Sequence, residues 1–164
     1  MEISKASTDD SYQIGELLVE TWRYAYTGIM QQSVLDELSV QRRSEGWMRV
    51  LEKNPEVYVL RNGASVSGVV QVCRFRGEIE PYRNFSEIPV LYLKPNFIGQ
   101  GYGSMLLKYA HAQNTVSESE GVALWVLEKN TRAIDFYSKH GYTFSGESKA
   151  HSEELAEHLY VKMV

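Results

Sequence analysis

Cysteine, proline and long apolar runs are all scarce in this chain of 164 residues. Cys73 is the only cysteine, which excludes an internal disulfide and any thiolate-rich metal site. No segment approaches the roughly 18 continuous apolar residues of a membrane span, and the sequence does not begin with the charged-then-apolar pattern of a signal peptide. We therefore expect a cytoplasmic protein with no membrane partner.

An excess of positive charge is also missing, because the formal net charge is -4 and the Lys and Arg residues are scattered along the chain. Such a chain has no general attraction for nucleic acid, so we expect no nucleic-acid partner. The four histidines lack the spacing of metal-binding motifs, which predicts no metal site. The 11 tyrosines and 3 tryptophans suit a core and a partly apolar pocket with hydroxyl groups.

Hydrophobic spacing predicts one continuous domain over residues 1–164, because no repeat, low-complexity tract or linker interrupts the sequence. Apolar residues at helical spacing follow the capping segment Thr8-Asp9-Asp10, which predicts a first helix. A second helical region ends before Asn54-Pro55. Asn62-Gly63 marks a hairpin turn between two strands. We expect strands at about 2–7, 57–60, 66–75, 88–93, 123–127, 142–146 and 158–163, and helices at about 8–25, 34–51, 101–112 and 131–140. This order predicts an α/β layered domain with a mixed sheet.

The segment from Ile98 to Ser104 contains three glycines between an expected strand and an expected helix. Unpaired N–H groups at a helix N-terminus hold anions, and glycines let phosphates approach the backbone. A dinucleotide fingerprint is not completed convincingly, and a P-loop would need a lysine where Ser104 stands. Coenzyme A is the remaining common ligand of such a turn, although glycine-rich turns also serve chain reversal alone.

At these residues the sequence resembles the GNAT N-acyltransferase family, and the resemblance covers nearly the whole chain. The glycine turn is similar to the family's pyrophosphate motif, except that Ile98 stands where the family has Arg or Gln. The segment 87–95 resembles the strand that splays from its neighbour to admit the pantetheine arm. The segment 130–142 resembles the family's Asn, Ala, Phe-Tyr helix, and 21–28 its acceptor-side helix and loop.

The resemblance implies a layered domain with a mixed, mostly antiparallel central sheet flanked by helices, whose splayed strands form the cofactor cleft. It implies acetyl-CoA (coenzyme A) as the cofactor. The residues it assigns to cofactor binding are Leu91, Leu93, Ile98, Gly99, Gln100, Gly101, Tyr102, Gly103, Ser104, Asn130, Ala133 and Tyr137.

By the same resemblance, the Leu91 N–H holds the thioester carbonyl, Glu87 is the general base and Tyr137 is the general acid. Residues four apart on a regular strand share a face, which predicts that Glu87 and Leu91 point to the same side. Glu87 is otherwise a solvated acid, and Tyr137 otherwise packs in the core. Trp22, Tyr26 and Glu87 are expected to contact the acceptor.

The sequence therefore predicts an acetyl-CoA-dependent N-acetyltransferase that acetylates the amine of a small molecule or peptide by direct attack. Cys73 has no histidine beside it in sequence that could act as a base and activate it for an acetyl-enzyme. A non-catalytic acyl-CoA-binding module and a structural or interaction domain are the alternatives. The acceptor and the oligomeric state stay open, although a homodimer is common among GNAT-like domains.

Overall fold

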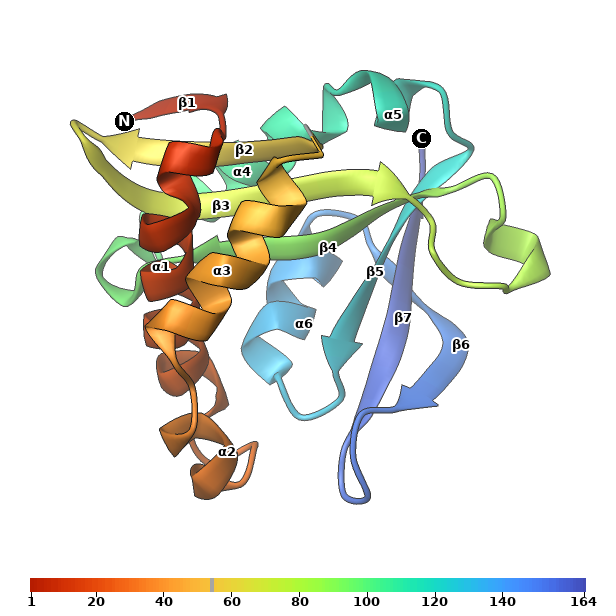
Figure 1. Ribbon diagram of the computed structural model, residues 1–164. Helices are drawn as coiled ribbons and strands as arrows, with labels where there is room; N and C mark the ends of the chain where they lie inside the picture. Colours follow the sequence, from red (N-terminus) through yellow and green to blue (C-terminus); the bar gives the residue numbers. More distant parts are fainter. Residues whose placement is uncertain (54) are drawn as a thin grey trace.

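The computed structural model describes residues 1–53 and 55–164, which form one sheet with helices on both faces (Figure 1). Its main elements are β1 (Glu2–Lys5), α1 (Ser11–Tyr26), α2 (Gln32–Asp36), α3 (Val40–Leu51), β2 (Glu56–Asn62), β3 (Ser65–Arg74), β4 (Ser86–Leu93), α4 (Tyr102–His111), α5 (Asn114–Ser117), β5 (Gly121–Leu127), α6 (Thr131–Lys139), β6 (Thr143–Ala150) and β7 (Ala156–Met163). In the described residues, no helix is long and apolar enough to cross a membrane.

The sheet has seven strands in the order β1-β2-β3-β4-β5-β7-β6. Neighbouring strands run antiparallel everywhere except at β4 and β5, which are parallel. A parallel pair needs a crossover connection, and α4 and α5 supply it. The predicted mixed, mostly antiparallel sheet flanked by helices is confirmed.

Helices cover both faces of the sheet (Figure 1), and a hydrophobic cluster lies on each face. On one face, Ile14 and Leu17 of α1 and Trp47 of α3 pack with Val57 and Val59. On the other face, Leu106 of α4 and Ile134 of α6 pack with strand residues of even number in β2, β3 and β5, among them Leu60, Val70 and Val126. The period-2 alternation of the strands thus fixes which side chains can meet which helices.

Beyond their first residues, β4 and β5 separate. Only Ser86 with Val122 and Glu87 with Ala123 are paired across this junction, although both strands continue for several residues. In Figure 1, β5, β7 and β6 diverge from β4, and α6 lies between the two halves. The predicted splay of the cofactor strand is confirmed, and it opens the centre of the sheet.

The expected elements differ from the observed ones mainly at their ends. The hairpin turn is confirmed, and Gly63 has a positive φ of 60°. The first helix begins at Ser11, because residues 8–10 form a separate 3-10 turn. The expected helix at 34–51 is two helices, and α5 was not predicted. The expected stop at Asn54 falls outside the described residues.

Candidate functional site

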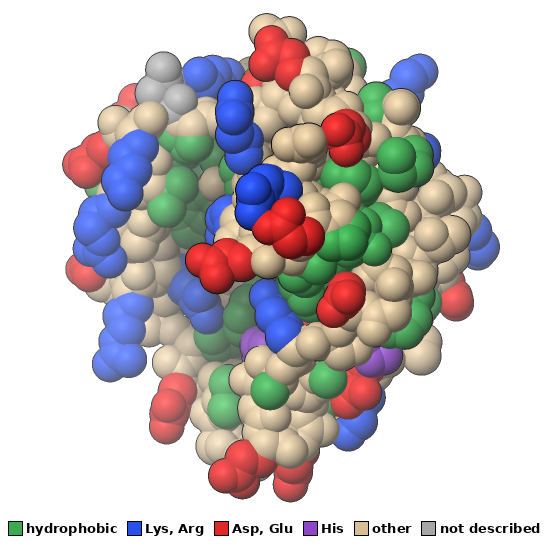
Figure 2. Space-filling model, turned by 90° about the vertical axis from the view of Figure 1, so that its right-hand side faces the viewer, with side chains coloured by type: hydrophobic (Ala, Val, Ile, Leu, Met, Phe, Trp, Pro, Cys, Tyr) green, Lys and Arg blue, Asp and Glu red, His purple; other side chains and the backbone are tan. Residues whose placement is uncertain are grey.

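A cleft of about 890 Å³ runs along the splay between β4 and β5 (Figure 2). We call its two parts the glycine side and the aromatic side. The glycine side is lined by Leu93, Ile98, Gly99, Gly101, Gly103, Ser104, Ala133 and His140. The aromatic side is lined by Trp22, Tyr26, Arg76, Glu87, Tyr92, Trp125, Lys149, His151 and Glu157.

The glycine side is built from the turn that starts α4. Gly101 is the residue before the helix and has a left-handed φ of 86°, and a side-chain carbon placed there would meet nothing within 4 Å. Gly103 lies in the first turn, where such a carbon would come within 3.3 Å of Phe136. Open space beside unpaired helix N–H groups is the arrangement that accommodates a phosphate.

Two residues of the predicted turn point their side chains elsewhere. The Gln100 amide donates to the Asn96 carbonyl at 2.7 Å, and Tyr102 packs edge-on against Phe97. Neither residue is among those that line the cleft. The Ser104 hydroxyl does line it, and it lies 2.9 Å from Nε2 of His140, which ties α4 to the end of α6.

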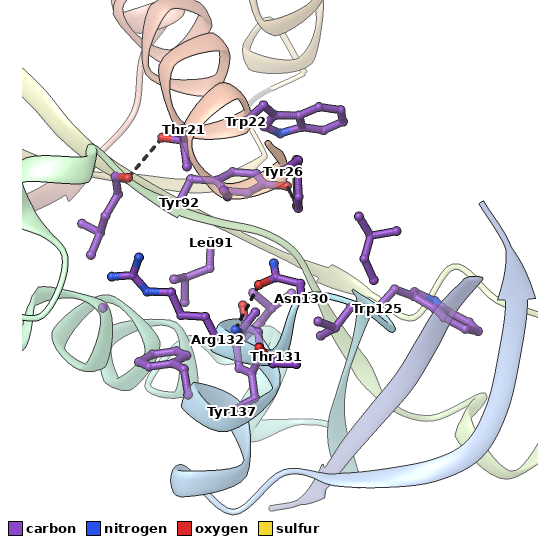
Figure 3. Close-up of a pocket in the computed structure, with 18 of the residues that line it drawn as sticks. Thr21, Trp22, Tyr26, Leu91, Tyr92, Trp125, Asn130, Thr131, Arg132 and Tyr137 are labelled. Carbon is purple, nitrogen blue, oxygen red and sulfur yellow. Dashed lines mark hydrogen bonds between the residues drawn. The ribbon is translucent and has the colours of Figure 1, made fainter. Parts of the chain in front are cut away.

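The backbone of β4 opens onto the cleft at alternate residues. The Lys94 N–H donates to Ser67 of β3 at 2.9 Å, so by alternation Tyr92 also turns its backbone toward β3. Leu91 and Leu93 therefore turn theirs the other way, toward the splay. The Leu93 carbonyl confirms this direction, because the Thr21 hydroxyl of α1 donates to it at 3.1 Å (Figure 3).

The expectation that Glu87 and Leu91 share a face is wrong. Pairing with β3 shifts register between Val90 and Glu87, so that β4 has one residue more than its partner there. Pro89, which has no N–H to donate, lies in this interruption. Ile88 consequently packs on the same face as Leu91, and Glu87 turns to the aromatic side.

The Glu87 carboxylate is held by Arg76 at both oxygens. Oε2 accepts from the Arg76 backbone N–H at 3.0 Å and from Nε at 3.2 Å, and Oε1 accepts from Nη2 at 2.7 Å. The Glu87 side chain is 2% exposed, whereas that of Arg76 is 64% exposed. Hydrogen bonds to Glu87 raise the pKa of Arg76. The pair therefore leaves a guanidinium edge, not a carboxylate, at the surface.

Two tyrosines and a tryptophan meet where α1 crosses β4 (Figure 3). The hydroxyls of Tyr26 and Tyr92 lie 3.5 Å apart, and the Trp22 and Tyr26 rings meet edge to face at 5.3 Å. Burial raises the pKa of both hydroxyls, and also that of Tyr137. All these hydroxyls therefore keep their protons at neutral pH and can donate hydrogen bonds into the cleft.

Helix α6 presents Asn130 and Tyr137 to the cleft from the opposite wall (Figure 3). Asn130 caps the helix, since its side-chain oxygen accepts from the Ala133 N–H at 3.2 Å. Tyr137 lies about two helical turns further on and packs edge-on against Phe136 and Tyr142. Leu91, Asn130, Ala133 and Tyr137 are thus brought together around the splay, as the sequence predicts.

Several residues of the cleft were missed by sequence reasoning: Tyr92, Trp125, Arg132, Lys149 and Glu157. The signal for Glu157 was available, because it alternates with Leu159 and Val161, which pack on the same face as Trp125. For Lys149 and Arg132 there was no signal, since exposed cations occur on most surfaces. Among the described residues, no group of three His, Cys, Asp or Glu side chains could hold a metal ion.

Known proteins resemble this chain in sequence and in fold. The sequence profile described as "Acetyltransferase (GNAT) domain" matches residues 53–144. The spermidine N(1)-acetyltransferase of Thermoplasma acidophilum is 24% identical over 151 residues, 87% of this chain and 88% of that protein. The peptidyl-lysine N-acetyltransferase YjaB of Salmonella typhimurium is 36% identical over 59 residues, 36% of this chain and 37% of that protein. The structure of the PaiA N-acetyltransferase of Thermoplasma acidophilum in complex with coenzyme A superposes with a TM-score of 0.80 at 20% identity, covering 99% of this chain and 98% of that chain.

Proposed function

Because the chain belongs to the GNAT acetyltransferase family, we propose that it transfers an acetyl group from acetyl-coenzyme A to a primary amine by direct attack in a ternary complex. The observation that supports this most is the separation of β4 from β5. The gap between the two strands opens beside the glycine turn, and the backbone of Leu91 faces into it. A ligand with phosphates at one end and a thioester at the other matches these two features together.

The residues of the cleft fit coenzyme A. The N–H groups at the start of α4 and the open approach at Gly101 suit the pyrophosphate. Ile98 stands where the family has Arg or Gln, so one polar side chain is missing from the turn. Arg132 and Lys139 line the same cleft and can supply positive charge, and His140 lines it as well. The Leu93 N–H turns to the splay, where it can pair with the pantetheine arm.

Acetyl-coenzyme A supplies an activated thioester, whose carbon forms a bond with the amine nitrogen while the bond to sulfur breaks. We assign the Leu91 N–H to the carbonyl oxygen, because a donor fixed in the backbone stabilises developing negative charge without reorganising. We assign Tyr137 to the proton that the sulfur takes up, and the proton that the nitrogen loses as the amide forms returns to Tyr137 through solvent. Burial raises the pKa of Tyr137, so the hydroxyl is protonated, as a proton donor must be, throughout the working pH range.

Direct transfer without an acetyl-enzyme is supported by Cys73. Burial is the main cause that raises the pKa of this thiol, to about 11, so it carries almost no thiolate at neutral pH. Cys73 is paired across the sheet with Glu87, whose negative charge also opposes thiolate formation. The chain therefore has no activated nucleophile at this position.

Removal of the acceptor's proton is the role for which Glu87 was expected, and the geometry supports a different one. Both carboxylate oxygens of Glu87 already accept hydrogen bonds from the Arg76 guanidinium, so they are engaged in the ion pair and are not directed at an acceptor amine. We propose that Glu87 holds Arg76 in place and that the amine enters the cleft neutral. The apolar residues that pack beside Leu91 favour the neutral amine over the ammonium at the reacting position.

The acceptor proposed is a primary alkylamine. The two relatives named for a substrate act on spermidine and on peptidyl-lysine, and both of these compounds have primary alkylamines. Release of coenzyme A thiol with a panel of primary amines tests this proposal. Tight binding of coenzyme A with no turnover on any amine would instead favour an acyl-CoA-binding module.

A further inference from the structure

On the aromatic side, an ammonium group already lies over a tryptophan ring. Nζ of Lys149 lies 4.1 Å from the centre of the Trp125 ring. The same Nζ lies 3.4 Å from Oε2 of Glu157. A ring face and a carboxylate are the two groups that together recognise an alkylammonium ion in a partly dry site.

Strand pairing places these three residues on one face of the sheet. Glu157 of β7 pairs with Leu127 on one side and with Lys149 of β6 on the other. Trp125 lies two residues before Leu127 on β5, so its side chain projects from the same face. All three residues line the cleft, and Figure 3 shows Trp125 on the β5 side, apart from the cluster of Trp22, Tyr26 and Tyr92.

Strand register also places Trp125, Lys149 and Glu157 near Leu91, the residue assigned to the thioester carbonyl. Glu87 of β4 pairs with Ala123 of β5. Leu91 lies four residues further along β4, and one of these four is the extra residue, so Leu91 is level with the residue three beyond Ala123, which is Val126. Val126 lies between Trp125 and Leu127, the neighbours of Lys149 and Glu157. Glu157 lines the same cleft as Tyr26 and Tyr92, and its negative charge adds to the rise that burial causes in the pKa of both hydroxyls.

The Lys149 ammonium can be displaced. Its side chain is 49% exposed, on the edge strand β6, whereas Glu157 is 23% exposed. The Lys149 ammonium lies 3.4 Å from Oε2 of Glu157, longer than a hydrogen-bonded ion pair, and Nδ1 of His151 lies 3.9 Å from the same oxygen. No hydrogen bond to Oε1 of Glu157 is found among residues 1–53 and 55–164. The carboxylate can therefore receive a second cation or exchange the first.

We propose that Trp125 and Glu157 form a subsite for a second ammonium group of the acceptor, which displaces Lys149 when it binds. This inference rests on the proposed function and makes it narrower: the preferred acceptor is a diamine or polyamine that presents one neutral amine at Leu91. Lys149 acts as an internal competitor, which raises the concentration of acceptor needed to fill the subsite.

The test compares cadaverine with pentylamine, which share an alkyl chain and differ in the second ammonium. We expect the wild-type KM for cadaverine to be about tenfold lower, as a partly desolvated cation–π contact with an ion pair allows. Glu157→Gln should remove this preference, so that the ratio of the KM values for pentylamine and cadaverine falls from about ten to about one. Lys149→Met should lower the KM for cadaverine by about two- to fivefold. Glu147→Gln and Lys108→Met, at exposed positions outside the cleft, should change neither.

Equal KM values for the two amines in the wild-type protein would overturn the subsite, as would a Glu157→Gln variant that raises both KM values equally. Calorimetric binding of the same two amines to the complex with coenzyme A gives an answer that does not depend on turnover. Acetylation of pentylamine without a preference for cadaverine contradicts the subsite and leaves the proposed function standing. Glu157-dependent binding of cadaverine without acetylation of any amine supports the subsite and contradicts the proposed function.

Discussion

Glu87 and Ala123 are the last residues that β4 and β5 pair before the two strands separate. The separation frees the edge of β4 that carries the Leu91 N–H, and an unpaired backbone donor is otherwise costly in the middle of a sheet. Binding of a ligand with its own amides satisfies that edge. The cleft is therefore a consequence of strand pairing that stops early, and the side chains around it complete the site.

Coenzyme A should stabilise the folded protein. A ligand that binds only the native state at about 100 times its dissociation constant adds roughly 2.7 kcal/mol to the free energy of unfolding. For a chain of this size, that corresponds to a rise of several degrees in Tm. A thermal melt with and without coenzyme A measures it, with adenosine as a control that lacks the pyrophosphate and pantetheine. No rise in Tm at millimolar coenzyme A would remove the cofactor assignment.

Gly101→Val should weaken coenzyme A binding by about tenfold or more. The branched side chain would occupy the open approach above the turn, and the φ of 86° adds strain of roughly 1–2 kcal/mol to folding. Gly146→Val is the matched control, since Gly146 has a φ of 91°, equally open surroundings and a position outside the cleft. Both variants should lose similar stability, and Gly101→Val alone should lose affinity in calorimetry. Equal affinities in the two folded variants would place the phosphates elsewhere.

The general layout of the fold was predictable, because alternation along the strands and the Asn62-Gly63 turn are local signals. The glycine turn was predictable for the same reason, since it depends on backbone conformation within a few residues. The direction of Glu87 was not predicted, because one extra residue in a strand reverses every side chain beyond it. Pro89 was the available warning of that interruption.

The sequence did not predict which side chains the site residues contact. The ion pair of Glu87 with Arg76 joins residues on either side of a loop, and the contact of Lys149 with Trp125 joins strands that are not neighbours in the sheet order. Such contacts depend on how loops and side chains settle after the sheet has formed. Composition and spacing carry no information about such contacts. The role that we propose for Glu87 therefore differs from the one expected from the sequence, because its partner Arg76 was not foreseen.

Glu87→Gln should reduce stability and leave the shape of the pH–rate profile unchanged. The amide cannot hold the Arg76 guanidinium at both oxygens, and with one partner largely exposed we expect a loss of about 1–2 kcal/mol in urea unfolding. If the amine enters neutral, kcat/KM should rise with pH toward the pKa of the acceptor in both proteins. Arg76→Gln is the matched control and should cost a similar amount, with a double variant that is less than additive. A rate loss of about 100-fold confined to Glu87→Gln, greatest at low pH, would restore Glu87 as the base.

Tyr137→Phe should lower kcat and leave the affinity for coenzyme A nearly unchanged, because it removes one hydroxyl and keeps the ring that packs against Phe136 and Tyr142. General acid catalysis contributes about 100- to 10,000-fold, and a thiol with a pKa near ~8.5 leaves readily, so we expect a loss near 100-fold at neutral pH. Burial raises the pKa of Tyr137, so the wild-type hydroxyl does not titrate in the range measured.

The defect of Tyr137→Phe should therefore shrink as pH rises toward the pKa of the leaving thiol, because departure as thiolate then costs less. Tyr142→Phe is the control: it loses a hydroxyl that lies 2.9 Å from Nε2 of His111 and outside the cleft, so it should affect stability and not rate. The measurement is a pair of pH–rate profiles under conditions where a burst experiment shows chemistry to be rate-limiting. A Tyr137→Phe protein with wild-type turnover at neutral pH would leave Tyr137 as a packing residue, and the sulfur would then take its proton from water.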